Sequence, residues 1–184
     1  VILDEPEYSE EDGTGETRVG SMKSQIKFEL DSNNNPHIFF VDGAARASGG
    51  HIYGTILNGN WTFEDIGSAD GTTSDSIDLA IGPNDDIHVV YMGNQGMNSV
   101  HAYLPSSSSI GQNSWVKTEF VQNEHEGIYL AVDVDSSNNT HIVHYDNYYE
   151  HNNQLIHRVY DSNFANISYS IVDSSEGRFN SLVS

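Results

Sequence analysis

A threefold internal repeat is the feature of this sequence that most restricts its fold. Three similar segments, each a turn-forming stretch followed by His and a β-branched or aromatic run, begin at Asp31, Gly82 and Asp135. The histidines of these segments are 51 and 53 residues apart and are His37, His88 and His141. Two further pairs keep a similar spacing, Trp61 with Trp115 and His101 with His157. Regular self-similarity at about 50 residues is typical of architectures built from stacked repeats.

Within each repeat the hydrophobic residues alternate with a period of two, which indicates half-buried β-strands and not helices. The alternating sets are Ile26, Phe28 and Leu30, then Ile77, Leu79 and Ile81, then Leu130, Val132 and Val134. A turn and a second strand follow each set, a third strand is expected near 51–57, 99–104 and 155–160, and a fourth begins at Trp61, Trp115 and Ile167. Asn58-Gly59 is a strong hairpin signal between the third and fourth strands of the first repeat.

Four antiparallel strands in about 50 residues match one blade of a β-propeller. The sequence therefore predicts an all-β fold, a β-propeller fragment of about three four-stranded antiparallel blades with partial strands at both ends. The predicted segments are 1–20 (acidic, with a possible last strand of a preceding blade), 21–70, 71–123 and 124–174 (the blades), and 175–184 (first strand of a further blade). Three blades cannot close a ring, so we expect either missing blades in a longer protein or self-association, for instance of two chains.

The repeated segments also carry a family resemblance. Asp31 to Asp42 and Asp135 to Asp146 resemble the Asp-Ser-Asn-x-x-x-His-Ile-x-Tyr repeats of tandem β-propellers in secreted proteins of marine microbes. They are also broadly similar to neuraminidase-like repeat proteins. The middle repeat departs from the pattern, with Gly82 and Gly93 in place of the first and last Asp. The resemblance implies a propeller fold and an extracellular or cell-surface location, and it carries over no catalytic residue.

The charge balance excludes several partners. The chain has 27 acidic and seven basic residues among 184, a formal net charge of −20. Such a chain repels nucleic acid, and no apolar run is long enough for membrane insertion. The absence of cysteine excludes disulfides and thiolate chemistry, and we expect no cofactor.

The repeated polar residues favour structural roles over metal binding. His37, His88 and His141 occupy the same place in different blades, too far apart to share one metal ion, so each is expected to hydrogen-bond a turn or a neighbouring blade. Asp31, Asn33 and Asn35 have a spacing that could suit calcium, but the same residues are typical of a tight turn, which we favour. Trp61 and Trp115 are expected to pack between blades.

One loop combines residue types that suit a sugar ligand. Between the second and third strands of the third repeat lie the ligand-binding candidates Asp146, Tyr148, Tyr149, Glu150 and His151. Loops on a regular scaffold are where binding sites are commonly built. Three Asn-x-Ser/Thr sites, at Asn60, Asn138 and Asn166, are candidates for N-glycosylation.

These observations predict a non-catalytic binding or adhesion module, with a glycan or a protein as ligand. One alternative is a polysaccharide lyase or glycosidase in which His144, Tyr145 and His151 act as base and acid. Another alternative is a structural segment of a surface or filament protein. No nucleophile motif or phosphate-binding loop is present, so an enzyme is the less favoured hypothesis.

Overall fold

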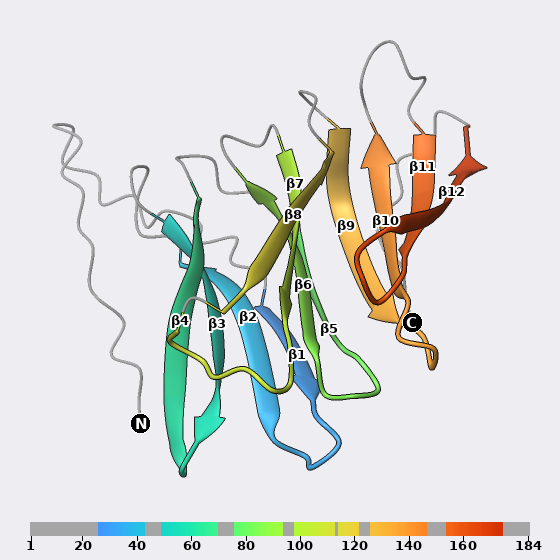
Figure 1. Ribbon diagram of the computed structural model, residues 1–184. Coiled ribbons are helices and arrows are strands. Elements are labelled where there is room, and N and C mark those ends of the chain that lie inside the picture. Colours follow the sequence, from blue (N-terminus) through green and yellow to red (C-terminus); the bar gives the residue numbers. More distant parts are fainter. Residues whose placement is uncertain are drawn as a thin grey trace, which may run out of the picture.

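The computed structural model describes residues 26–42, 49–69, 76–93, 98–112, 114–121, 126–146 and 154–174, and every regular element in these ranges is a β-strand (Figure 1). The strands form three four-stranded antiparallel sheets, each in simple sequence order. The first sheet contains β1 (Ile26–Leu30), β2 (Pro36–Asp42), β3 (Gly49–Leu57) and β4 (Asn60–Ala69). The second contains β5 (Ile77–Ile81), β6 (Ile87–Gly93), β7 (Asn98–Leu104) and β8 (Val116–Val121). The third contains β9 (Glu126–Val134), β10 (Thr140–Asp146), β11 (Gln154–Tyr160) and β12 (Asn166–Asp173).

The sheets stand side by side as successive blades (Figure 1). The first strands of the three sheets make many of the contacts between sheets. The first strand of the middle sheet, β5, lies against both β1 and β9. The all-β, three-bladed prediction is therefore confirmed. The predicted end segments 1–20 and 175–184 lie outside the described residues, and within the described part of the chain no helix has the length and apolar character to cross a membrane.

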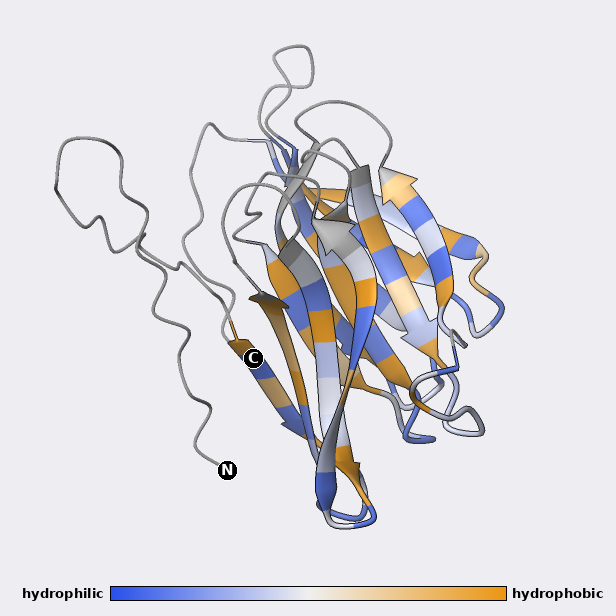
Figure 2. Cartoon of the chain, turned by 90° about the vertical axis from the view of Figure 1, so that its left-hand side faces the viewer, coloured by the Kyte–Doolittle hydropathy of each residue, from blue (hydrophilic) through white to orange (hydrophobic). Residues whose placement is uncertain are grey.

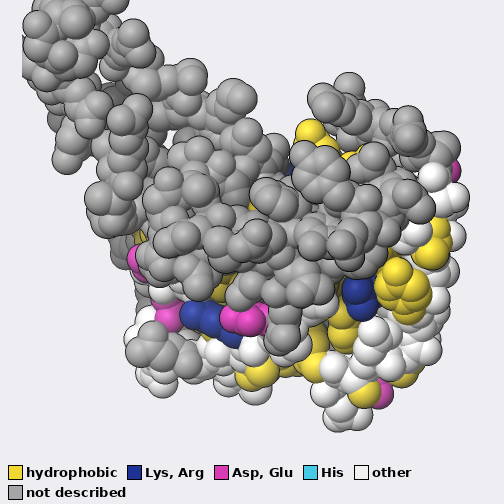
Figure 3. All heavy atoms as spheres, turned by 90° about the horizontal axis from the view of Figure 1, so that it is seen from above, with side chains coloured by type: hydrophobic (Ala, Val, Ile, Leu, Met, Phe, Trp, Pro, Cys, Tyr) yellow, Lys and Arg dark blue, Asp and Glu magenta, His cyan; other side chains and the backbone are white. Residues whose placement is uncertain are grey.

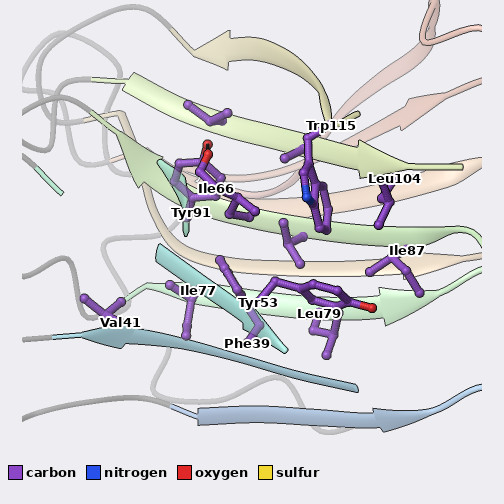
Figure 4. Close-up of a cluster of buried hydrophobic side chains, with 13 residues drawn as sticks. Phe39, Val41, Tyr53, Ile66, Ile77, Leu79, Ile87, Tyr91, Leu104 and Trp115 are labelled. Carbon is purple, nitrogen blue, oxygen red and sulfur yellow. Dashed lines mark hydrogen bonds between the residues drawn. The ribbon is translucent and has the colours of Figure 1, made fainter. Parts of the chain in front are cut away.

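A hydrophobic core fills the space between the first and second sheets (Figure 4). Phe39 and Tyr53 of the first sheet are at most 1% exposed, and Trp115 of the second sheet packs edge-on against Tyr53 with the ring centroids 5.1 Å apart. The indole nitrogen of Trp115 donates a hydrogen bond of 3.1 Å to the carboxylate of Glu64 on β4. The expected packing of Trp115 between blades is confirmed, whereas Trp61 is 41% exposed and only stacks on Phe63 of its own strand, so that prediction is wrong for Trp61 within this chain.

A second core lies between the second and third sheets, where Val90 and Ile142 are fully buried. The middle sheet is thus covered on both faces, which explains why Ile87–Tyr91 of β6 are all buried instead of alternating between buried and exposed. Among the described residues, the first and third sheets are each covered by a neighbouring sheet on one face only.

Polar contacts at the first strands also join the sheets. Asp78 on β5 forms an ion pair with Lys27 on β1, with 3.1 Å between the charged atoms. Its carboxylate also accepts a hydrogen bond of 2.9 Å from the backbone N–H of Val132 on β9. This single carboxylate therefore links all three sheets. At the turn end, Ser32 donates its backbone N–H and its hydroxyl to the carboxylate of Asp85, at 2.8 and 2.6 Å.

Candidate functional site

The second strand of each sheet ends at Asp42, Gly93 and Asp146, and this end of the molecule is seen from above in Figure 3. Among the described residues visible there, basic and acidic side chains lie next to hydrophobic ones. The candidate binding residues Tyr148, Tyr149, Glu150 and His151 belong to residues 147–153, which lie outside the described residues. Only the base of this loop is described, where Asp146 pairs with Gln154 on β11 and with Glu126 on β9. Asp146 is 2% exposed, so it belongs to the base of the loop and not to an open surface.

An exposed tyrosine that the sequence analysis did not single out lies close to this base. Tyr129 on β9 is 52% exposed and has a φ of +56°, a left-handed conformation that bulky residues rarely adopt. A β-bulge produces it, since β9 contributes an extra residue where it pairs with β10 between Val143 and Tyr145. The ring of Tyr129 lies 6.3 Å from that of Tyr145. No sequence signal marks the bulge, and simple alternation from Leu130 gives Tyr129 no special role.

His144 is buried beneath the same end of the third sheet. Its side chain is 0% exposed, its Nε2 accepts a hydrogen bond of 3.1 Å from the Arg158 Nε, and its Nδ1 is buried without a hydrogen-bond partner. Burial, assisted by the charge of Arg158, lowers the pKa of His144 to about 3. The imidazole is therefore neutral near pH 7 and closed to solvent.

The structure does not bring together the two described residues of the catalytic alternative, His144 and Tyr145. Successive residues of a strand point to opposite faces, so His144 lies toward Phe120 and Arg158, while Tyr145 lies toward Tyr129. Tyr145 is 5% exposed. A substrate therefore cannot meet both side chains at once, and the third candidate, His151, lies outside the described residues.

The repeated histidines form one hydrogen-bonded ring pair in each sheet. In every case the Nδ1 of the second-strand histidine meets a polar atom of an aromatic residue on the third strand. The pairs are His37 with the Tyr53 hydroxyl at 2.5 Å, His88 with the His101 Nε2 at 3.2 Å, and His141 with the His157 Nε2 at 3.0 Å. A hydrogen bond between two imidazoles needs one nitrogen with a proton and one without, so at least one ring of each histidine pair is neutral.

The surroundings of His37, His88 and His101 favour the neutral form of these three rings. Burial lowers the pKa of His88 to about 4 and holds that of His101, which also faces His88, well below the ordinary value. Burial also lowers the pKa of His37, although the Asp31 carboxylate, 3.6 Å away, opposes this. The pairs cross-link strands inside each sheet, and the described residues contain no cluster of three His, Asp, Glu or Cys side chains that could hold a metal ion.

The Asp-Ser-Asn segments fold as tight turns closed by the Asp side chain. Asp31 accepts the backbone N–H groups of Asn33 and Asn35 at 2.9 and 2.7 Å, and its other oxygen accepts the Asn35 side-chain amide at 2.7 Å. Burial alone would raise the pKa of Asp31, but these hydrogen bonds outweigh it and lower the pKa. Amide N–H groups already donate hydrogen bonds to the carboxylate oxygens that calcium would need as ligands. This agrees with the favoured interpretation of Asp31, Asn33 and Asn35 as turn residues.

The same turn recurs in two other places. Asp135 accepts hydrogen bonds from the backbone of Ser137 and Asn139 and from the Asn139 side chain, and these lower its pKa to about 2. Asp161, between β11 and β12, accepts the N–H groups of Asn163 and Ala165, both at 2.9 Å. Four residues of this turn type take a left-handed φ, at Asn34, Asp85, Asn138 and Phe164.

The three glycosylation candidates differ in access. Asn60 is exposed at the start of β4, and Asn166 is exposed at the start of β12. The side-chain oxygen of Asn138 is buried instead, 3.0 Å from the position that a Cβ on Gly82 would occupy. Asn138 therefore packs between the second and third sheets, and a glycan there would have to displace that contact.

Comparison with known proteins does not assign this chain to a family. No family model matches it, and no curated protein matches it. Among solved structures the chain is similar to a fucose lectin from Kordia zhangzhouensis in complex with methyl-fucoside, with 10% sequence identity and a TM-score of 0.45. The alignment covers 80% of this chain and 96% of the lectin chain. The fold assignment above rests on the strands and their pairing, and a likeness of this extent assigns no ligand.

Proposed function

We propose that this chain is an extracellular carbohydrate-binding module whose binding surface lies at the loop-bearing end of the third sheet. The observation that supports the proposal best is Tyr129, an aromatic ring left 52% exposed by a bulge beside the base of the variable loop. Bulges and left-handed non-glycine residues are concentrated at functional sites, because the surrounding structure must hold them in place.

The chemistry of the neighbouring sequence suits a sugar. The loop after Asp146 carries Tyr148, Tyr149, Glu150 and His151. Aromatic rings can stack on the apolar C–H faces of a pyranose, while carboxylate, amide and imidazole groups accept and donate hydrogen bonds to its hydroxyls. Tyr129 extends this set with a ring from the adjacent strand β9, which is held in place by its pairing with β10 and therefore loses less freedom on binding.

Binding is favoured over catalysis by the burial of His144. A general acid or base must come within hydrogen-bond reach of the reacting group. His144 is 0% exposed and Tyr145 points to the other face of the strand, so the described residues offer no accessible acid–base pair at this end of the third sheet. An extracellular setting fits the high surface charge, since screening in salty water limits the self-repulsion of 20 excess negative charges.

A glycan array compared across three proteins tests the proposal: the unchanged chain, Tyr129→Ala and Tyr169→Ala. Methyl-fucoside, the ligand of the lectin mentioned above, belongs on the array together with acidic and neutral polysaccharides. We expect one class of glycan to bind, and Tyr129→Ala to weaken that binding about tenfold or more, as loss of a stacking aromatic does.

Tyr169→Ala is the matched control, because Tyr169 is 50% exposed but lies on the outer strand β12 beside Arg158, at 4.9 Å. Its binding should stay unchanged. A chain that binds no glycan, or one whose binding survives Tyr129→Ala intact, would contradict the proposed site. Release of new reducing ends from any polysaccharide would contradict the non-catalytic assignment.

A further inference from the structure

The outward face of the first sheet is apolar, and Figure 2 looks onto the molecule from that side. Ile26, Phe28 and Leu30 on β1 are 66%, 57% and 48% exposed, and Trp61 and Phe63 on β4 are 41% and 44% exposed. These side chains share a face, since Ile26 pairs with Phe40, Phe28 pairs with Ile38, and Phe63 lies against Phe40 and over Gly54. We call this the first-sheet face. A contiguous apolar surface of this kind marks an interaction site.

The repeat shows what normally covers such a face. Phe28 pairs with Ile38 as Leu79 pairs with Val89 and as Val132 pairs with Ile142, so the three pairs are structurally equivalent. Leu79 and Val132 are 4% and 7% exposed because the preceding sheet packs on them, whereas Phe28 is 57% exposed. The first strands show the same difference two residues earlier. Ile26 is 66% exposed, whereas its equivalents Ile77 and Leu130 are only 1% and 6% exposed.

The two tryptophans make the same point. Trp61 comes one residue before Thr62, which pairs with Thr55, and Trp115 comes one residue before Val116, which pairs with Tyr103. Thr55 and Tyr103 pair in turn with the repeated histidines His37 and His88, so the two tryptophans are equivalent. Trp115 is 9% exposed because its ring packs on Tyr53 of the preceding sheet, and Trp61 has no preceding sheet in the described part of the chain. The first-sheet face therefore has the side chains of an inter-sheet interface.

The outward face of the third sheet is the matching surface. Phe39 and Val90 are both 0% exposed at the two inter-sheet interfaces, and their equivalent on the third sheet is Val143, which is only partly buried. The ring pair His141–His157 stands where His37–Tyr53 and His88–His101 stand in the other sheets. We call this the third-sheet face.

We propose that the first-sheet face of one copy of this chain packs on the third-sheet face of a second copy, closing a six-bladed ring from two chains. Closed propellers have about four to eight blades, and two copies give six, while one copy gives three and three copies give nine.

Polar groups at the turn end agree with this pairing. Between the first and second sheets, Ser32 donates to the side chain of Asp85, and its equivalent in the third sheet is Ser136. The equivalent of Asp85 in the first sheet is Asn34, which shares its left-handed φ, at 61° against 60°. In the ring, Ser136 of one copy meets Asn34 of the other, where the amide oxygen of Asn34 can accept the backbone N–H and its NH2 group can donate to the Ser136 hydroxyl. This inference does not depend on glycan binding.

Sedimentation velocity on the 184-residue chain tests the proposal with two interface variants and one control. The unchanged chain should form a particle of twice the 20.3 kDa chain mass. Phe28→Glu and Val143→Glu, on the two different faces, should each weaken association more than about tenfold, because each places a charge in the buried contact. Val116→Glu should leave the particle unchanged, because Val116 is equally exposed, at 52%, but lies on the outer strand of the middle sheet.

The outcomes separate the arrangements. A chain that stays monomeric at all concentrations overturns the proposal, and the first-sheet face then needs a blade from another polypeptide segment. A dimer that Phe28→Glu breaks but Val143→Glu does not is a face-to-face dimer, which also overturns it. If either glutamate variant loses its far-UV circular dichroism, Trp61→Ser and His157→Ser test the same two faces. In a Trp115→Phe background, association should also shift the fluorescence of Trp61 to shorter wavelength.

Discussion

Acidification should unfold this protein well above the pH at which its carboxylates titrate, because three histidines are buried in the neutral form. His51, His88 and His144 are at most 2% exposed. Burial lowers the pKa of His51 to about 4, of His88 to about 4 and of His144 to about 3. In the unfolded chain the same groups titrate near the ordinary value of about 6.5.

The sign of the effect follows from proton linkage. Since the folded pKa values lie below the unfolded one, the unfolded state binds more protons between these limits, and stability falls as the pH decreases below about 6.5. At pH 5 each of the three histidines costs about 2 kcal/mol relative to pH 7.5, or about 6 kcal/mol together. The total stability of a domain is about 5–15 kcal/mol, so the chain should be close to unfolding at pH 5.

Carboxylates do not mask this window. Hydrogen bonds lower the pKa of Asp135 to about 2, and the net pKa of Asp31 is also lowered, so the stability that these groups supply is present at pH 5 and is lost only under more acidic conditions. Loss of negative charge on acidification relieves repulsion and acts in the opposite direction, so the measurement belongs in enough salt to screen surface charges.

Urea unfolding followed by circular dichroism at pH 7.5, 6.5, 5.5 and 5 measures the effect. His51→Phe is the informative variant, because the ring of His51 lies among those of Phe39 and Tyr91, with centroids 6.1 and 4.2 Å away. This variant should lose about 2 kcal/mol less than the unchanged chain between pH 7.5 and 5. A free energy of unfolding that stays flat over this range, or a His51→Phe curve parallel to the original, would refute the reasoning.

Three further predictions concern the contacts between sheets, and chemical denaturation measures each of them. Trp115→Ala should destabilise the chain by about 3–5 kcal/mol, because it empties the core between the first two sheets; a loss below about 1 kcal/mol would contradict that packing. Gly82→Ala should cost about 1–3 kcal/mol, since its Cβ would lie 3.0 Å from the Asn138 oxygen; an unchanged midpoint would show that Asn138 moves freely. Asp78→Ala should cost about 1–3 kcal/mol by leaving the buried N–H of Val132 without its acceptor, and high salt should not abolish the difference as it would for a surface ion pair alone.

The strands and turns were predictable because they depend on local patterns. Alternation at Ile77, Leu79 and Ile81 sufficed to place β5, and the Asp-Ser-Asn spacing at Asp31 sufficed to predict a turn that bonds its own amides. Asn58-Gly59 forms the expected hairpin turn with positive φ at both residues, 52° and 79°.

Features that depend on the neighbouring sheet were not predictable in the same way. Trp61 and Trp115 look alike in sequence, yet one is exposed and the other buried, because burial depends on whether a preceding sheet is present. In the sequence, His144 lies close to the candidate loop. In the structure, the alternation of side chains along β10 points it toward Arg158 and toward Phe120 of the second sheet, where it is buried. Tyr129 was missed because a bulge has no signal in the alternation of one strand and depends on how two strands pair.

The departures of the middle repeat follow from its place between two sheets. Gly82 stands where Asp31 and Asp135 stand in the other repeats, and the Asn138 side chain of the next sheet fills the space that an Asp would need. Without that Asp, the buried Nε2 of His88 has no hydrogen-bond partner where the Nε2 atoms of His37 and His141 face Asp31 and Asp135, and its Nδ1 contacts the Thr140 hydroxyl across the sheet boundary, at 3.2 Å. The two boundaries therefore use different polar contacts on the same scaffold. Such differences make each face specific for one neighbour, because a blade inserted out of order would leave buried polar groups without partners.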